Sequence, residues 1–546
     1  MTAEAEKKAA DASSPPEGRE QTTDETGGLW SAQRRALTTG LVLTITFIAS
    51  EALAVVTIMP VVARDLGGLR LYGWVFSAFM LGNVVGIVAA GRQADRYGPA
   101  RPFIGGLILF CAGLATAGLA PTMLVLVGGR ALQGIGAGAV PAVAYVAIGR
   151  SLPERLRARM MAVMSTAWVL PGLAGPAVSA AVASLVGWRW VFLGLLPLVA
   201  VTGALAIPAL VRLGKRPQAE GEADNARDAG DAHDADDARN ADDAHNADDA
   251  DDAGDDSSDS DNSQDAATQH KLSLGVAAAA GAGLVLAGLT LTAGSGQYVL
   301  GPVLLVVGLV ATGRSLRRLL PAGTFSARPG LPAVILCRGL LTFTFFGADA
   351  YVTLTITTVR HHSTELAGLA VTGATIAWTA GAWLQSRLNG RWEARRLVAC
   401  GLAIVVIGLA AMALVLLPAT PVQAGIAAWT VAGFGIGLAY APISLLMLRE
   451  APAGREGWAS ASLSLADVLG TAFGIGAGGA AVAAATAHGW PLAHGVAIAF
   501  AIAGTGAIAL SAASRRLPPS LTEASPGLTD IATDLRPEQD SRPPAA

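Results

Sequence analysis

The chain has few charged residues: only 14% of its 546 residues are Asp, Glu, Lys or Arg, whereas 52% are hydrophobic and the mean hydropathy is +0.50. A soluble domain carries about a quarter charged residues, so this composition argues against a soluble enzyme and favours a polytopic membrane protein. Cysteine is also scarce. Cys111, Cys337 and Cys400 lie in apolar runs without metal-ligand spacing, and we interpret them as small buried residues rather than a disulfide framework.

The sequence also lacks the motifs of a membrane enzyme. It contains no His-rich metal cluster, no glycine loop before a Lys that would hold phosphate, and no context for a nucleophilic serine. The first 33 residues are mostly polar, which argues against a cleavable signal peptide. We therefore expect a protein that is not an enzyme and that stays in the membrane.

Acidic residues are concentrated outside the apolar part of the chain. Residues 219–265 hold 19 acidic residues and 2 arginines, and the segments 1–33 and 517–546 are also net acidic. The remainder has 10 acidic and 31 basic residues, so the overall net charge of -3 conceals a basic apolar body. Only three of those ten acids lie well inside apolar runs: Glu51, Asp349 and Asp467.

A helix needs about 20 apolar residues to cross a bilayer. The sequence contains fourteen runs of this kind, which predict an all-α membrane protein with 14 transmembrane helices. The runs are 36–62, 73–94, 102–121, 123–148, 158–185, 188–211, 273–293, 298–313, 332–357, 366–388, 396–417, 422–447, 458–485 and 492–513.

The positions of the arginines indicate which side of the membrane each loop lies on. Short cytoplasmic loops of membrane proteins are enriched in Lys and Arg. If the N-terminus is cytoplasmic, the predicted outer loops keep only Arg64, Arg70, Arg189 and Arg360, and the other loop arginines are all inside. The sequence therefore predicts a multi-pass protein of the cell (plasma) membrane with both termini in the cytoplasm.

Composition divides the chain into six parts. The acidic linker consists mostly of Ala, Asp, Asn and His and cannot bury enough surface to fold, so we expect a solvated tether. A metal-binding role for its Asp and His residues is the alternative, although a calcium loop would also need a Gly and a Glu at set positions. The parts are a disordered cytoplasmic N-terminus (1–35), an N-terminal six-helix half (36–212), the disordered linker (213–272), two extra helices (273–313), a C-terminal six-helix half (332–516) and a disordered cytoplasmic tail (517–546).

Three short motifs stand at the ends or inside the predicted spans. The loop after the second span has glycines that allow close approach and a tight turn around an acid and an arginine. The fourth span contains an arginine, which is costly in a membrane and needs a polar partner. Prolines in the fifth span permit a kink. The residues are Gly91, Asp95, Arg96 and Gly98; Arg130, Gln133 and Gly134; and Pro171, Gly172, Gly175 and Pro176.

These motifs resemble those of the major facilitator superfamily and, within it, the 14-span drug:proton antiporter family. The resemblance covers nearly all of residues 36–513. Leu126, Arg130, Gln133, Gly134 and Gly136 are similar to the family's proton-coupling motif, and Gly175-Pro176 to its antiporter motif, although Ser179-Ala180 replace two glycines there. The resemblance implies two six-helix halves related as repeats, with a binding site at the bilayer midplane between them.

The three intramembrane acids are candidates for proton coupling. At 1.5 Å per residue, Glu51 lies about 16 Å and Arg130 about 12 Å from the outer ends of their spans, so a contact between them is geometrically possible. Asp349 also lies about 12 Å from an outer end. A carboxyl group removed from water holds a proton more readily, which a proton-coupled exporter requires. Structural pairing with a hydroxyl or an arginine is the alternative for each acid.

Other residues are weaker candidates for a substrate cavity. Trp378 and Trp383 lie on one span and would suit a planar cation, although packing is the alternative explanation for both. Asp467 lies near the inner end of its span and fits a helix-end packing role equally well.

The resemblance implies a proton-coupled secondary transporter that exports hydrophobic or cationic small molecules and confers drug or antibiotic resistance (multidrug efflux by drug:H+ antiport). Two alternatives remain: a dedicated exporter of one metabolite, and a membrane sensor that does not transport. We expect no cofactor other than the proton gradient and no bound metal. The expected partners are a small-molecule substrate, protons and the lipid bilayer, with no nucleic acid, and the chain is expected to act as a monomer.

Overall fold

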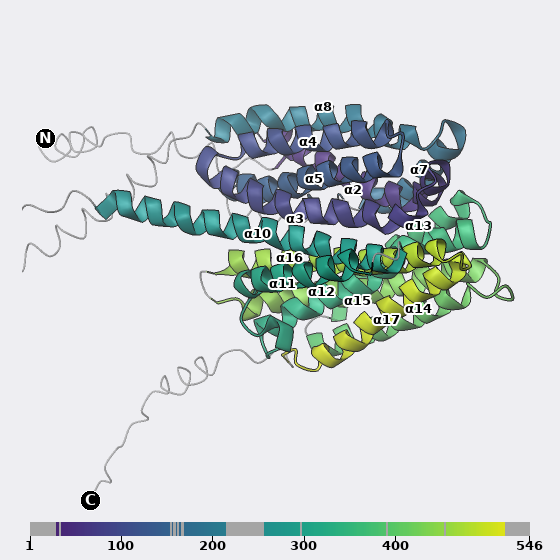
Figure 1. Cartoon of the computed structure of the whole chain (residues 1–546). Helices are drawn as coiled ribbons and strands as arrows, with labels where there is room; N and C mark the ends of the chain where they lie inside the picture. Colours follow the sequence, from purple (N-terminus) through teal and green to yellow (C-terminus); the bar gives the residue numbers. More distant parts are fainter. Residues whose placement is uncertain are drawn as a thin grey trace, which may run out of the picture.

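The computed structural model describes residues 29–31, 34–152, 156, 160, 163, 164, 167, 169–214, 256–294, 298–388, 391–452 and 455–518. Helices account for the regular structure of these residues, in two bundles that lie side by side (Figure 1). Within the described part of the chain, thirteen helices are long and apolar enough to cross a membrane, and α7 is a shorter apolar helix. Together they match the fourteen predicted spans.

The first bundle is the N-terminal half, coloured purple to blue in Figure 1. Its first helix, α2, contains Pro60, and Thr122 caps the start of α5 by accepting a hydrogen bond from the backbone N–H of Val125. The start of the predicted fifth span, residues 158–168, lies largely outside the described residues. The elements are α2 (Arg35–Asp65), η1 (Leu69–Leu71), α3 (Tyr72–Tyr97), α4 (Ala100–Gly118), α5 (Met123–Ser151), α7 (Val169–Leu185) and α8 (Arg189–Gly214).

The second bundle is the C-terminal half, coloured green to yellow. Its first helix continues into a π-helical turn at its end. The elements are η2 (Thr324–Ser326), α12 (Leu331–Leu354), η3 (Thr355–Val359), α13 (Thr364–Leu388), α14 (Ala394–Leu414), α15 (Gln423–Glu450), α16 (Glu456–Ala487) and α17 (Leu492–Ser514).

Close glycine contacts show that the two halves repeat one packing plan. A Cβ atom on Gly134 of α5 would lie 2.0 Å from the carbonyl oxygen of Phe79 on α3, and a Cβ atom on Gly433 of α15 would lie 2.2 Å from that of Ala374 on α13. Only glycine permits such an approach of two helix backbones. Gly433 follows Gly134 by 299 residues, and the same interval separates Gly136 from Gly435 and Gly138 from Gly437.

Two further helices, α10 (Asp256–Gly294) and α11 (Leu300–Leu319), pack against each other at the seam between the halves (Figure 1). In α10, Leu286 would meet a Cβ atom on Gly476 of α16, and Thr290 accepts a hydrogen bond of 3.2 Å from Trp74 Nε1 of α3. The helix pair therefore contacts both halves.

Two predicted boundaries of disordered segments are wrong. The linker was expected to be disordered up to residue 272, but α10 begins at Asp256, because extending an existing helix by further backbone hydrogen bonds costs little. The N-terminal segment was expected to be disordered up to residue 35. Leu29 is nevertheless buried, and its carbonyl oxygen accepts a hydrogen bond from Thr38. Residues 1–28, 215–255 and 519–546 lie outside the described residues.

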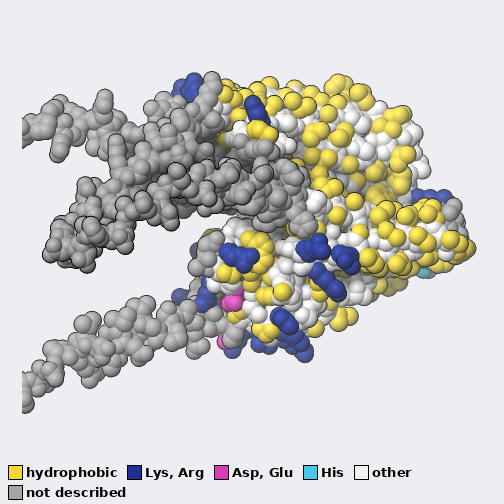
Figure 2. Space-filling view, turned by 60° about the vertical axis from the view of Figure 1, so that its left-hand side comes forward, with side chains coloured by type: hydrophobic (Ala, Val, Ile, Leu, Met, Phe, Trp, Pro, Cys, Tyr) yellow, Lys and Arg dark blue, Asp and Glu magenta, His cyan; other side chains and the backbone are white. Residues whose placement is uncertain are grey.

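The helix directions place the arginines mainly at one end of the bundles. We call this the arginine-rich end and define it by the starts of α2 and α12 and by the ends of α8 and α15. Figure 2 shows Lys and Arg side chains gathered in the left and middle of the view, whereas hydrophobic side chains cover much of the right. Arg64, Arg70, Arg189 and Arg360 lie at the opposite, arginine-poor end. This asymmetry agrees with the bias expected of a membrane protein.

The halves contact each other in the arginine-poor part of the molecule. A Cβ atom on Gly73 of α3 would lie 2.7 Å from the Cα atom of Gly479 on α16. Tyr72 donates a hydrogen bond of 2.9 Å to the carbonyl oxygen of Ala350. Thr353 of α12 donates one of 2.8 Å to Val56 of α2. The two halves are therefore closed against each other at this end.

Candidate functional site

A buried polar cluster holds the predicted pair of the N-terminal half. Arg130 of α5 is 2% exposed and Glu51 of α2 is 1% exposed, and Arg130 Nη1 donates to Glu51 Oε1 in an ion pair. Gln133, one turn after Arg130, accepts from Arg130 Nη1 at 3.1 Å and donates to Glu51 Oε1 at 3.2 Å. The depths estimated from the sequence allowed this contact, and the structure contains it.

Further contacts hold Arg130 in place. Its Nε donates to the carbonyl oxygen of Val75 at 3.3 Å, and its guanidinium carbon lies 4.2 Å from the centre of the Phe79 ring. Glu51 Oε2, in contrast, has no hydrogen-bond partner among the described residues. The cluster neutralises the charge of Glu51 and leaves one carboxylate oxygen with an unused acceptor site.

The C-terminal half holds its acid differently. Asp349 of α12 is 9% exposed, and its Oδ1 accepts a hydrogen bond of 2.7 Å from Nε1 of the fully buried Trp429 on α15. The structure gives Asp349 no ion pair among the described residues. Trp429 follows Arg130 by 299 residues, the interval of the glycine pairs, so a neutral indole occupies the place of the guanidinium.

Aromatic rings continue from Trp429 along the C-terminal half. Phe345 stacks on Trp429 with 5.1 Å between ring centres, and Trp378 of α13 contacts Phe345 edge-to-face at 5.7 Å. Tyr440 of α15 lies 5.3 Å from Trp378. These four rings form a continuous aromatic row between α12, α13 and α15, with Asp349 at one end.

Asp467 lies at the other end of this row. Tyr440 donates a hydrogen bond of 2.8 Å to Asp467 Oδ2, and the guanidinium carbon of Arg338 lies 3.4 Å from the centre of the Tyr440 ring. The position of Asp467, eleven residues into α16, does not fit the helix-end packing role that was one prediction for it. It is instead part of a charged cluster within the C-terminal half.

One predicted cavity residue, Trp383, lies apart from the aromatic row. Trp383 is 60% exposed, and the guanidinium carbon of Arg387 lies 3.5 Å from the centre of its ring. It lies five residues beyond Trp378 on α13, and one and a half turns of helix point the two side chains in different directions. Only Trp378 belongs to the aromatic row.

The structure describes part of the predicted motif at the end of α3. Asp95 and Arg96 lie near the end of α3, but their side chains lie outside the described residues. Gly98 ends that helix with φ 77°, a conformation that favours glycine. Gly91 faces open space, so close helix approach does not explain it. These observations support the predicted turn but not a tight contact at its first glycine.

The proline motif of α7 faces the other half of the molecule. Pro176 is buried, and its carbonyl oxygen would lie 3.3 Å from a Cβ atom on Gly368 of α13. At Gly175 a Cβ atom would meet its nearest neighbour at 3.9 Å, an ordinary contact, so this glycine is not needed for close packing. The tight position is Gly172, where a Cβ atom would lie 2.1 Å from Cγ2 of Thr375.

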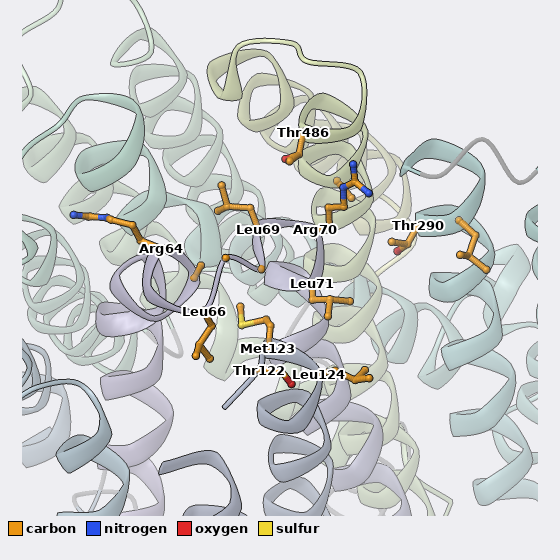
Figure 3. A pocket seen from close by; sticks show the side chains of 15 residues that line it. Arg64, Leu66, Leu69, Arg70, Leu71, Thr122, Met123, Leu124, Thr290 and Thr486 are labelled. Carbon is orange, nitrogen blue, oxygen red and sulfur yellow. The ribbon is translucent and has the colours of Figure 1, made fainter. Parts of the chain in front are cut away.

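A cavity of about 740 Å³ opens at the arginine-poor end (Figure 3). The turn between α2 and α3, the start of α5 and residues of α10 and α16 line it, including Arg64, Arg70, Met123, Thr290 and Thr486. In Figure 3 the Arg64 and Arg70 side chains point in different directions. None of the predicted site residues lines this cavity.

Sequence reasoning missed Trp429, Phe345, Tyr440 and Arg338. Arg338 lies inside an apolar run just as Arg130 does, and that was a signal for it. The repeat interval of 299 residues, which assigns Trp429 to the place of Arg130, needs the glycine contacts of the structure.

Comparison with known proteins places this arrangement in a family. The model of the Major Facilitator Superfamily matches residues 39–323. A probable multidrug-efflux transporter of Mycobacterium tuberculosis is 27% identical over 515 residues, which are 91% of this chain and 99% of that protein. The multidrug transporter protein MdtP of Bacillus subtilis is 33% identical over 181 residues, 33% of each chain.

Solved structures share the fold. A D-xylose–proton symporter superposes with a TM-score of 0.54 at 14% identity, covering 91% of this chain and 100% of that one. The POT family transporter PepTSo superposes with a TM-score of 0.56 at 13% identity, covering 87% and 97%. With the family model matching more than half of the sequence, this chain belongs to the Major Facilitator Superfamily and is a multi-pass membrane transporter.

Proposed function

We propose that this transporter exports hydrophobic or cationic small molecules in exchange for protons, as a multidrug efflux protein. The names of its relatives in Mycobacterium tuberculosis and Bacillus subtilis support the multidrug part of the proposal. The two buried acids support the proton part, because an antiporter needs a group that binds a proton in one state and releases it in the other.

The observation that carries the proposal is the unequal pairing of the two acids. Glu51 has a cationic partner in Arg130, whereas the only hydrogen-bond donor to Asp349 among the described residues is the neutral indole of Trp429. A buried carboxylate without a counter-ion is costly, and either a bound proton or a cationic ligand removes that cost. Proton and cation therefore compete for Asp349, which is the minimal mechanism of antiport.

Glu51 and Arg130 have a different role in this mechanism. Their ion pair joins α2 to α5 within one half. Protonation of Glu51 would weaken the pair and release Arg130 towards the interface between the halves. We propose that Glu51 couples proton binding to the rocking of the halves, and that Asp349 is where proton and substrate exchange.

The closed end fits an inward-facing state. The halves meet in the arginine-poor part of the molecule, and the arginine bias assigns that end to the outside. Both termini would then be cytoplasmic. We further propose that the chain works as a monomer in the plasma membrane and that its partners are substrate, protons and lipid, with the proton gradient as its only energy source and no nucleic acid involved.

The proposal is tested with vesicles that hold the purified chain and a fluorescent cationic dye. An imposed pH gradient should drive dye movement by the wild type, and Asp349→Asn should abolish it because Asn neither binds a proton nor pairs with a cation. Glu51→Gln should slow transport while dye binding is retained. If both variants move the dye as fast as the wild type, the proton-carrier assignment is wrong.

A sensor that does not transport is the rival function, and the acidic linker separates the two. Deleting residues 219–255 leaves all described helices in the chain. An exporter should keep most of its transport after this deletion, whereas dye transport that requires the deleted segment would contradict a simple exporter.

A further inference from the structure

The second charged cluster of the C-terminal half is not used by the proton mechanism above. Arg338 of α12 is 2% exposed, its Nη2 donates to the hydroxyl of Ser444 on α15, and its guanidinium lies over Tyr440. Asp467 of α16 completes the cluster through its hydrogen bond from Tyr440. Three helices therefore bring a cation, an anion and an aromatic face together.

The cluster is incompletely paired. Two buried nitrogens of Arg338, Nε and Nη1, have no hydrogen-bond partner among the described residues, and neither has Asp467 Oδ1. Arg130 shows the contrast, because both its Nε and its Nη1 are bonded. Buried charged donors without acceptors are costly, so Arg338 is prepared for an acceptor that the described residues do not supply.

The position of Arg338 gives this acceptor access to the aromatic row. Tyr440, Trp378 and Ser444 are only partly buried, and Trp378 lies 5.3 Å from Tyr440. The helices α12, α13 and α16 are those that contact the N-terminal half. A ligand seated between the halves against the rings of Trp378 and Tyr440 would therefore bring a substituent to Arg338.

We propose that Arg338, Tyr440 and Asp467 form a subsite for the carboxylate of an aromatic ligand. The unbonded N–H groups on Nε and Nη1 of this guanidinium are charged donors, and a carboxylate is an acceptor with which such donors form strong hydrogen bonds. The aromatic body of the ligand would lie on Tyr440 and Trp378. The transported compounds would then include carboxylate-bearing molecules as well as simple cations.

Asp467 restricts the class further. Its free Oδ1 accepts a hydrogen bond, and its negative charge disfavours ligands with several anionic groups. Asp349 at the far end of the aromatic row accepts a cationic group. The ligand class is therefore amphoteric: an aromatic compound with one carboxylate and at least one amino group. This inference rests on the proposed function in taking the C-terminal half as the substrate surface.

The test compares two dyes that differ only in the carboxylate. The full-length chain, purified in phosphatidylcholine nanodiscs, is titrated into a rhodamine with a free carboxylate and into the methyl ester of the same dye, with anisotropy as the readout. Arg338→Met should weaken binding of the carboxylate dye tenfold or more and that of the ester less than about twofold. Arg338→Lys should give an intermediate loss, because an ammonium keeps the charge but not the planar set of N–H donors.

A matched control uses another arginine that stacks on an aromatic ring of this half. Arg387 lies 3.5 Å from the ring centre of the exposed Trp383, outside the aromatic row, so Arg387→Met should bind both dyes as the wild type does. Retained ester binding shows that a variant is folded. If Arg338→Met does not fold, binding of the two dyes is compared in Arg338→Lys and Ser444→Ala instead.

The outcomes separate this inference from the proposed function. Equal losses for both dyes, or unchanged binding of the carboxylate dye by Arg338→Met, would overturn the subsite. A wild type that binds only the ester would also overturn it and leave the cation exporter intact. Arg338-dependent binding without any dye movement under a pH gradient would support the subsite and contradict the proposed function.

Discussion

Arg130 and Trp429 occupy equivalent places in the two halves, 299 residues apart, and each donates a hydrogen bond to the acid on the first helix of its own half. The pair Glu51–Arg130 is ionic and the pair Asp349–Trp429 is not. One repeat thus carries a neutralised carboxylate, and the other carries a carboxylate without a counter-ion among the described residues.

Removing Arg130 should destabilise the chain more than removing the whole ion pair. Arg130→Met leaves the Glu51 carboxylate buried and unpaired, which costs about 3–5 kcal/mol. The double variant Glu51→Gln/Arg130→Met leaves no buried charge and should recover a large part of that loss. Thermal unfolding of purified protein at constant pH measures both. A double variant that is less stable than Arg130→Met would show that the pair acts through something other than charge.

Trp429 should matter for its indole N–H more than for its size. Trp429→Phe keeps an aromatic ring against Phe345 but removes the donor to Asp349, so it should cost about 1–3 kcal/mol and change transport strongly. Trp429→Leu also removes the ring and should cost more stability without a larger loss of transport. Comparing transport rates and melting temperatures of the two variants separates the roles. If Trp429→Phe transports like the wild type, the hydrogen bond to Asp349 is not part of the mechanism.

Much of this arrangement could be predicted from the sequence, because membrane insertion imposes strong local rules. The helices follow apolar length, and the depth of Glu51 and Arg130 follows helical rise, so their contact could be expected. The contacts of Trp429 and Tyr440 could not be predicted. A Trp or Tyr in an apolar run is interpreted as a packing residue unless the structure shows an acid on a neighbouring helix beside it. The start of α10 in polar sequence was also unpredictable, because helix propagation there has no apolar pattern.

The glycines at equivalent positions of the two halves, Gly134 and Gly433, should tolerate no side chain. A Cβ atom at Gly134 or Gly433 would lie 2.0 or 2.2 Å from a backbone oxygen of the neighbouring helix, and backbone cannot move aside as a side chain can. Gly134→Ala and Gly433→Ala should each destabilise the chain by about 1–3 kcal/mol or more, as overpacking does. Gly91→Ala is the matched control, since a Cβ atom there meets nothing within 4 Å. Thermal unfolding in detergent ranks the three, and a stable Gly134→Ala would contradict the close approach.

Gly73 should control the equilibrium between the two states of the transporter rather than the stability of either half. A Cβ atom on Gly73 would lie 2.7 Å from the Cα atom of Gly479, across the closed end between α3 and α16. Gly73→Ala should therefore disfavour the closed contact while both bundles remain packed, and spin labels at the starts of α3 and α13 should report a larger population of long distances. Gly283→Ala is the control, because its nearest contact would be an ordinary 3.5 Å. Unchanged distances in Gly73→Ala, together with a lower melting temperature, would mean that this contact stabilises the fold and does not gate the transporter.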